Sequence, residues 1–304
     1  MIWFRSSPEK RLRKAANAGS ASEVLSLLRE GADPDKKSFL GDTPLVIAAR
    51  KGHLSVVEAL LNSSAAVDVQ DINGFTALMR ATLANRRDIV EFLLSRGANH
   101  DKVSNEGKTA LMFAVEKGHK EVVTALLAAG ATPDLQAPRP AGGKGPTPLM
   151  YTILNNHTDI VDMLIRAGGN INATCHDQST ALMWAAHSGN EEIIRALVAT
   201  GADPNLKDKD GRTALGYAVA PGHARVVSAL INAGADVNID FGRGITSLAL
   251  AVYGNHASIV SNLLEAGATT SGKLPDGETL LGIARRNGNE QVAQLLTRHG
   301  AKST

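Results

Sequence analysis

A short motif that begins Thr-x-Leu recurs along this chain at a fixed interval. Its clearest copy starts at Thr180 and reads Thr-Ala-Leu-Met-Trp-Ala-Ala-His-Ser-Gly. The other intact copies start at Thr43, Thr76, Thr109, Thr147, Thr213, Thr246 and Thr279. A degenerate copy near the start has Lys10 in the threonine position. Successive threonines lie 33 residues apart, except for one interval of 38 residues. A repeat of this length predicts a stacked array in which each unit packs against its neighbours.

Each copy contains two short helical patterns. In the copy that starts at Thr43, small and apolar residues at 45–49 form the first pattern, and those at 56–61 form the second. The threonine hydroxyl is a good cap for the first helix. Neither helix is long enough to be stable alone in water. Each must therefore bury its apolar face against its partner and the next repeat.

The break between the two helices contains only glycine and asparagine, which best tolerate a left-handed backbone. These residues are Gly19, Gly52, Asn85, Gly118, Asn156, Gly189, Gly222, Asn255 and Gly288. The second helices end in the same way at Gly31, Gly97, Gly130, Gly168, Gly201, Gly234, Gly267 and Gly300, with Ser64 as the exception. We expect a left-handed residue at every one of these positions, including Ser64.

Turn signals such as Asn73-Gly74 and Asp210-Gly211 lie between the copies and favour hairpin-like turns. A turn followed by two antiparallel helices every 33 residues resembles the ankyrin repeat. The resemblance implies an all-α solenoid of helix-turn-helix units with β-hairpin-like fingers, in a single domain over 1–304. The family's usual histidine after the leucine is replaced in every intact copy, for example by Met183.

The repeat boundaries follow from the spacing. We expect capping repeats at about 5–37 and 274–304, and inner repeats at 38–70, 71–103, 104–141, 142–174, 175–207, 208–240 and 241–273. The long interval places an insertion rich in Pro and Gly at 137–145, which is either a tolerated loop or a finger that contacts a ligand through Arg139 and Lys144. The segment Ile2-Trp3-Phe4 either covers the end of the first repeat or anchors a partner.

Composition excludes some classes of function. Lys and Arg number 32 against 30 Asp and Glu, and this balance does not favour a nucleic-acid partner. A local basic cluster is either a solvated face or a contact for an acidic or membrane surface; it comprises Arg5, Lys10, Arg11, Arg13 and Lys14. One cysteine, Cys175, allows no intrachain disulfide, and no apolar run reaches the roughly 18 residues of a membrane span. We expect a cytoplasmic protein that is monomeric when unbound.

Motifs for catalysis are absent from the sequence. It contains no phosphate-binding glycine loop, nucleophile elbow or paired-histidine metal helix. Five histidines follow the break residue and belong to the repeat pattern: His53, His119, His157, His223 and His256. Cys175 and His176 are adjacent, but two neighbours do not make a tetrahedral zinc site. We expect no enzymatic activity, no metal and no cofactor.

The fifth motif position is the candidate binding position, because the first helices and fingers of an ankyrin-like stack line one concave face. It holds Ile47, Arg80, Phe113, Tyr151, Trp184, Tyr217, Leu250 and Ile283. Four consecutive aromatic residues stand in the middle of this series. They either pack between repeats as core or anchor a partner.

The resemblance implies a non-catalytic module that binds a protein or peptide on the concave face, as an adaptor, scaffold or assembly factor. An alternative is a regulatory inhibitor that occludes an enzyme's site. Another is a reader of methylated lysine or another cationic peptide, since aromatic rings near an acidic residue attract such cations. The expected binding residues are Phe75, Arg80, Leu83, Phe113, Glu116, Tyr151, Trp184, His187, Tyr217 and Tyr253. The fingers add Phe39, Leu40 and Ile72.

Overall fold

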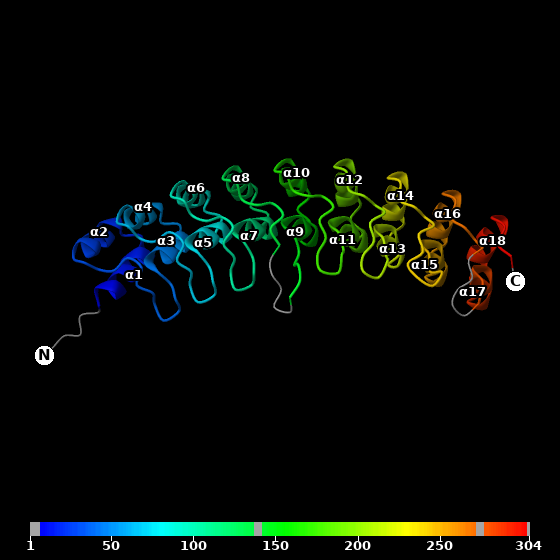
Figure 1. Ribbon diagram of the computed structural model, residues 1–304, viewed down its shortest axis with the longest axis horizontal. Helices are drawn as coiled ribbons and strands as arrows, with labels where there is room; N and C mark the ends of the chain where they lie inside the picture. Colours follow the sequence, from blue (N-terminus) through cyan, green and yellow to red (C-terminus); the bar gives the residue numbers. More distant parts are fainter. Residues whose placement is uncertain (1–6, 137–141, 272–276, 303–304) are drawn as a thin grey trace. The chain divides into compact units, whose positions relative to one another are not determined.

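The structure of the protein is a computed structural model that describes residues 7–136, 142–271 and 277–302. These residues form paired α-helices joined by loops (Figure 1). The backbone divides into two compact units, 1–169 and 170–304. The segment Ile2-Trp3-Phe4 and most of the predicted 137–145 insertion, including Arg139, lie outside the described residues. The repeat boundaries and the single continuous domain therefore stay predictions.

The described residues of unit 1 contain ten helices. They are α1 (Pro8–Ala18), α2 (Ala21–Arg29), α3 (Pro44–Lys51), α4 (Leu54–Asn62), α5 (Ala77–Leu83), α6 (Arg87–Ser95), α7 (Ala110–Lys117), α8 (Lys120–Ala128), α9 (Pro148–Leu154) and α10 (Thr158–Arg166). Odd-numbered helices pack on odd-numbered neighbours and even-numbered helices on even-numbered ones, while each consecutive pair also packs together. This arrangement makes two layers with the apolar core between them.

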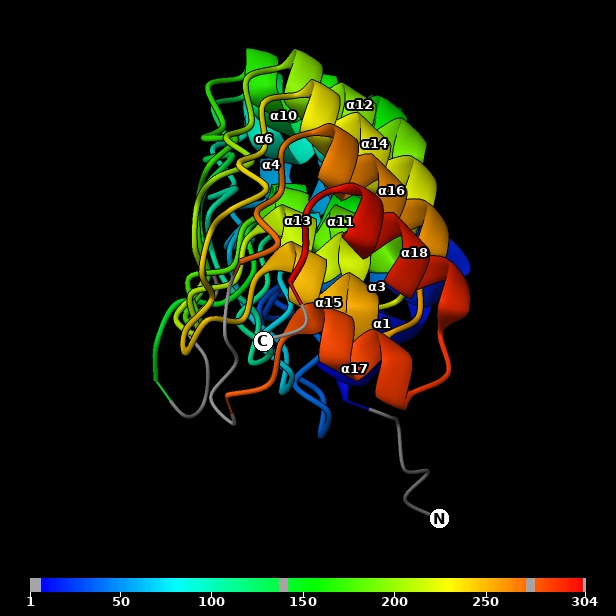
Figure 2. The ribbon, with the colours of Figure 1, turned by 90° about the vertical axis from the view of Figure 1, so that its right-hand side faces the viewer.

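Unit 2 repeats the arrangement with eight helices in its described residues. They are α11 (Ala181–Ser188), α12 (Glu191–Ala199), α13 (Ala214–Val219), α14 (Ala224–Asn232), α15 (Ser247–Tyr253), α16 (Ala257–Glu265), α17 (Leu280–Arg286) and α18 (Glu290–Arg298). Figure 2 shows the even-numbered helices of this unit in one layer and the odd-numbered helices in the other. Within the part of the chain that is described, no helix is both long and apolar enough to cross a membrane.

Both local predictions about helix ends are confirmed. The Thr43 hydroxyl accepts a hydrogen bond from the Val46 N–H at 3.3 Å, and the same bond caps the other odd-numbered helices that start at a motif threonine, except at Thr213. Every glycine and asparagine predicted to be left-handed has a positive φ. Ser64 has a φ of 66°, so this serine adopts the backbone conformation in which its equivalents are glycine.

Four of the five histidines that follow the break residues have the structural role that the sequence predicted. The Nε2 atom of His53 lies 3.1 Å from the carbonyl oxygen of Asn17, in the preceding repeat. The His53 ring covers Gly19, where a Cβ atom would lie 2.8 Å from its Nδ1 atom. His157, His223 and His256 repeat this contact on Gly118, Gly189 and Gly222. These rings tie neighbouring repeats together within each unit.

The loop before each odd-numbered helix from α3 onward is called a finger here. In unit 1 the α3 finger (30–43), the α5 finger (63–76) and the α7 finger (96–109) hang side by side below the odd-numbered helices (Figure 1). Backbone hydrogen bonds join them, from the Ile72 N–H to the Leu40 carbonyl oxygen at 3.3 Å and from the Asn105 N–H to the Asn73 carbonyl oxygen at 3.0 Å. The fingers and the odd-numbered helices together present one face.

Candidate functional site

The fifth motif position lies at the boundary between core and surface. In unit 1, Ile47 and Phe113 are buried, with 8% and 4% exposure, whereas Arg80 and Tyr151 are half-buried. In unit 2, Trp184 and Tyr217 are also half-buried. Some side chains at this position are therefore part of the core and others reach the surface. The neighbouring residues determine the burial of each one.

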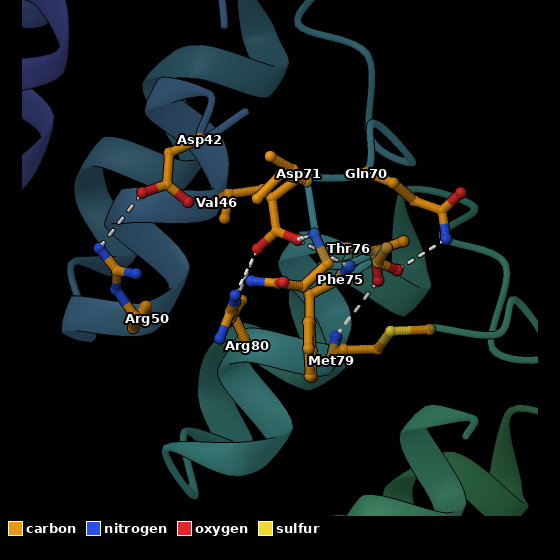
Figure 3. Close-up of polar contacts among 12 residues, drawn as sticks. Asp42, Val46, Arg50, Gln70, Asp71, Phe75, Thr76, Met79 and Arg80 are labelled. Carbon is orange, nitrogen blue, oxygen red and sulfur yellow. Dashed lines mark hydrogen bonds and ion pairs between the residues drawn. The ribbon is translucent and has the colours of Figure 1, made fainter. Parts of the chain in front are cut away.

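Arg80 stands in this otherwise apolar or aromatic series because it neutralises a buried carboxylate (Figure 3). The Asp71 side chain is only 1% exposed and forms an ion pair with Arg80. One Asp71 oxygen accepts the N–H groups of Asn73 and Phe75 at 2.8 and 3.0 Å, and the other accepts the Arg80 Nε–H at 3.1 Å. A buried charge needs such partners, so Asp71 and Arg80 depend on each other.

A column of stacked rings and cations extends from Arg80 through three repeats of unit 1. The Arg80 guanidinium lies 4.0 Å from the centre of the Phe75 ring, which stacks on Phe113 with 5.2 Å between ring centres. The Lys108 ammonium lies 5.6 Å from the centre of the Phe113 ring and 5.2 Å from that of Tyr151. Cations over aromatic faces are attracted by the ring quadrupole. We call these five residues the cation–aromatic column.

Glu116 completes the surroundings of Lys108. The Lys108 ammonium donates a 2.6 Å hydrogen bond to the Glu116 carboxylate. Partial burial lowers the pKa of Lys108, but the bond to Glu116 outweighs it and the pKa is raised overall. The sequence suggested Phe113, Tyr151 and Trp184 with Glu116 as a cage for a methylated lysine. Two of these rings and the carboxylate instead contact a lysine of the same chain, while Trp184 bonds to Ser179. This gives Phe113, Tyr151 and Glu116 an internal cation as their partner.

In unit 2 the Trp184 indole is held by the finger that precedes its helix. Its Nε1–H donates to the Ser179 hydroxyl at 3.0 Å, and that hydroxyl donates to the Asp177 carboxylate at 2.6 Å. Burial raises the pKa of Asp177, but hydrogen bonds from the Cys175 thiol and Ser179 outweigh it and lower the pKa to about 2. This network fixes one edge of the indole.

Tyr217 is fixed by a similar network. Its hydroxyl donates a 2.7 Å hydrogen bond to the buried Asp208 carboxylate. Burial and this bond raise the pKa of Tyr217 to about 12. The Arg212 guanidinium lies 4.9 Å from the centre of the Tyr217 ring, and the ring of His187 meets Tyr217 edge-on with 6.2 Å between centres. Tyr217 and His187, both predicted from the sequence, are brought together here.

Two spacings that the sequence prediction missed explain these contacts. The first joins the fifth motif position to the residue nine positions earlier, as in Asp71 with Arg80 and Asp208 with Tyr217. The second joins it to the residue five positions earlier and sets a cation beside a ring, as in Lys108 with Phe113. Arg212 with Tyr217 has the same spacing, and Phe75 with Arg80 has it with the ring and cation exchanged. Aligning the repeats and comparing these positions could have revealed both pairs.

The remaining predicted residues differ in exposure. Leu83 is half-buried and His187 is exposed. Tyr253 is 46% exposed, and Phe75 is buried at 8%, so Phe75 supports the surface from below. Larger exposures occur at Phe39, Leu40, Ile72 and Leu154.

Cys175, His176 and Asp177 place three potential metal-binding atoms within 4.8 Å of one another. The thiol donates to the Asp177 carboxylate at 2.8 Å, and burial is the main cause of the raised pKa of Cys175. A protonated thiol that already serves as a hydrogen-bond donor is a poor metal ligand. The cluster is accounted for as the hydrogen-bonded turn that supports Trp184.

Comparisons with known proteins agree with this architecture. The family model for ankyrin repeats in three copies matches residues 12–104, 132–208, 149–241 and 197–273, and the model for a single ankyrin repeat matches 106–137. No curated protein sequence matches the chain. Among solved structures, the chain is similar to the crystal structure of the ankyrin repeat domain of Bcl-3, a unique member of the IkappaB protein family. The identity is 30%, the match covers 72% of this chain and 97% of that chain, and the TM-score is 0.66. The chain belongs to the ankyrin repeat family.

Proposed function

We propose that the chain is a non-catalytic module that binds another protein or a peptide on the face made by its fingers and odd-numbered helices. Ankyrin repeat domains are typically protein-interaction modules. The observation that supports this role most directly is the half-buried state of Arg80, Tyr151, Trp184 and Tyr217 at equivalent positions. Side chains of this kind have an apolar body and a polar edge, which suits them to anchor a partner.

The mechanism is binding by a preformed surface. Arg80 is held by Asp71, Lys108 by Glu116, and Trp184 and Tyr217 by hydrogen bonds to their own fingers. Little side-chain entropy remains to be lost when a partner binds such fixed groups. Each unit offers its own anchors: Arg80 and Tyr151 in unit 1, and Trp184 and Tyr217 in unit 2.

The test is affinity capture from a native lysate followed by mass spectrometry, comparing the wild-type chain with Tyr151→Ala and Trp184→Ala. Phe92→Ala is the matched control, because Phe92 is also a half-buried aromatic residue but lies on the even-numbered helix α6. Circular dichroism establishes that each variant is folded. We expect a partner that is captured by the wild type and the control and lost with at least one of the other variants.

Retention of the captured partner by both test variants, or its equal loss from Phe92→Ala, would contradict the assignment of this face. Titration of the purified partner into each variant then gives the affinities. An aromatic anchor at a binding surface is worth about 2 kcal/mol or more, so the expected loss is about thirtyfold.

A further inference from the structure

The tips of the first two fingers carry exposed apolar side chains. Phe39 is 98% exposed, Leu40 is 60% exposed and Ile72 is 61% exposed. Phe39 and Ile72 occupy equivalent positions, four residues before the motif threonine. The same position in the other described fingers is polar or glycine: Asn105, Gly143, His176, Lys209 and Gly242. The apolar side chains are therefore a property of these two tips and not of the repeat.

Phe39, Leu40 and Ile72, called the tip patch here, are held together by the backbone. The Ile72 N–H donates to the Leu40 carbonyl oxygen at 3.3 Å, and a Cβ atom at Gly41 would lie 2.5 Å from the Ile72 nitrogen. On the other side, the Asn105 side-chain amide donates to the Ile72 carbonyl oxygen at 2.9 Å. The tips are fixed against each other, so the patch is present before any partner arrives.

Exposed lysines lie on the α3 finger and on two neighbouring helices, α1 and α3, which pack together. Five exposed lysines lie on α1, the α3 finger and the end of α3, and none of them takes part in the ion pairs found among the described residues: Lys10, Lys14, Lys36, Lys37 and Lys51. Two carboxylates of the α3 finger already have partners. Asp42 pairs with Arg50 at 3.6 Å, and Asp35 accepts the backbone N–H of Ala66 at 3.0 Å. The five lysines are therefore cations with which the carboxylates of a partner can pair.

The placement of the lysines favours an extended chain over a flat surface as the occupant. Lys10 and Lys14 share one face of α1, and Ile47 and Lys51 share one face of α3, because residues four apart are neighbours on a helix. Lys51 ends α3, about 10 Å along the helix from the finger at a rise of 1.5 Å per residue. A flat membrane that contacts the finger tips would not reach Lys51, whereas a peptide can extend along the face from the tips to the end of α3.

We propose that the tip patch and the five lysines form a docking site for an extended acidic segment of another protein. Its bulky apolar side chains contact Phe39, Leu40 and Ile72, and its carboxylates pair with the lysines. The inference rests on the proposed protein-binding function and adds the chemistry of the partner. Apolar contact supplies most of the affinity, and charge complementarity supplies the orientation and the rate of association.

The test uses a fluorescein-labelled synthetic peptide of about twelve residues in which Glu alternates with Leu or Phe, long enough to cross three helices spaced about 10 Å apart. Two control peptides replace either all Glu with Lys or all Leu and Phe with Ser. Fluorescence anisotropy measures binding to the wild-type chain at low and high salt. We expect binding of the acidic apolar peptide alone, weakening with salt because exposed charges are screened.

Chain variants locate the site. Phe39→Ser/Leu40→Ser should weaken binding about tenfold or more, and Leu154→Ser is the matched control because Leu154 is 62% exposed outside the patch. Lys36→Glu/Lys37→Glu should weaken binding and reduce its salt dependence. Lys207→Glu/Lys209→Glu, in the finger before α13, is the control for charge. All seven substituted side chains are exposed, and circular dichroism checks that each of the four variants folds.

Three results would overturn the docking site. They are no binding of the acidic apolar peptide, equal binding by the tip variant and its control, or Phe39-dependent binding of phosphatidylserine vesicles without peptide binding. The proposed protein-binding function is tested independently of this docking site. If affinity capture yields a specific partner that Phe39→Ser/Leu40→Ser retains and Tyr151→Ala loses, the protein-binding function stands and only this docking site is wrong.

Discussion

The ion pair between Asp71 and Arg80 allows a sharp test of how the repeats differ from one another. The repeat that follows it along the chain has Ser104 and Phe113 at the equivalent positions. The Ser104 hydroxyl accepts the Lys108 N–H at 3.3 Å, in the way that Asp71 accepts the Phe75 N–H. The chain therefore contains two combinations at these equivalent positions, a carboxylate with a cation and a hydroxyl with an aromatic ring.

Arg80→Phe alone should destabilise the protein strongly. It leaves the Asp71 carboxylate, which is 1% exposed, without its cation. Removing one partner of a buried ion pair costs about 3–5 kcal/mol. Two backbone N–H groups still bind Asp71, and Arg80 is 18% exposed, so we expect a cost at or just below the lower limit of this range, about 2–3 kcal/mol.

The double variant Asp71→Ser/Arg80→Phe should recover most of this loss. The serine keeps the hydrogen bond within the finger, and the new ring can stack on Phe75. We expect the double variant to lie within about 1 kcal/mol of the wild type, which gives a coupling energy of about 2 kcal/mol. Urea unfolding followed by circular dichroism measures the free energy of unfolding of the wild type, the two single variants and the double variant. The dependence of this free energy on urea concentration should be the same in all four.

A coupling energy below about 0.5 kcal/mol would refute this reasoning, because it would mean that the two side chains act independently. Asp71→Ser alone is the informative control. It leaves a half-buried Arg80 that can still reach water, so its cost should be smaller than that of Arg80→Phe.

Three further predictions concern single positions. Ser64→Gly should raise the free energy of unfolding by about 0.5–1 kcal/mol, since Ser64 has a φ of 66°, and a lower urea midpoint would contradict this. Gly118→Ala should cost about 1 kcal/mol more than Gly97→Ala, because both glycines are left-handed but only at Gly118 would the Cβ atom meet a ring, that of His157 at 2.6 Å; equal midpoints would exclude this contact. The pKa of Asp177 is depressed to about 2. Its contribution to the free energy of unfolding is therefore complete above its ordinary pKa near 3.8 and is lost as the pH falls through 2. Its size is about 1–2 kcal/mol after allowance for partial exposure, and Asp177→Asn should remove this acid-dependent part of the urea midpoint.

The parts of the fold that depend on local geometry could be predicted from the sequence. Thr43 caps its own helix, and the left-handed residues such as Gly52 and Asn85 end theirs, so each signal lies within a few residues of its effect. Repetition multiplies the signal because every copy must satisfy the same constraint. Even Ser64, the exception in composition, follows its equivalents in conformation.

The burial of the fifth motif position could not be predicted in this way, because it depends on residues elsewhere. Phe113 is buried since Phe75 of the preceding repeat stacks on one side and Lys108 of its own finger approaches it. Tyr151 receives the same lysine from the repeat before its own. A pattern within one repeat contains no information about contacts with the neighbouring repeat, whereas the pairs five and nine residues apart lie within a repeat and leave a trace in the alignment of repeats.

These pairs also explain how repeats with one backbone acquire different surfaces. The backbone fixes a place for the fifth motif side chain, and the finger decides what chemistry that place can hold. A carboxylate in the finger requires a hydrogen-bond donor at the fifth motif position, as with Asp208 and Tyr217. A serine permits a ring without a polar group, as with Ser104 and Phe113. Changing the fifth motif residue alone therefore leaves a mismatch in the finger. Under the proposed binding function, the anchor and its finger residue must change together, so the pair is the unit that sets specificity.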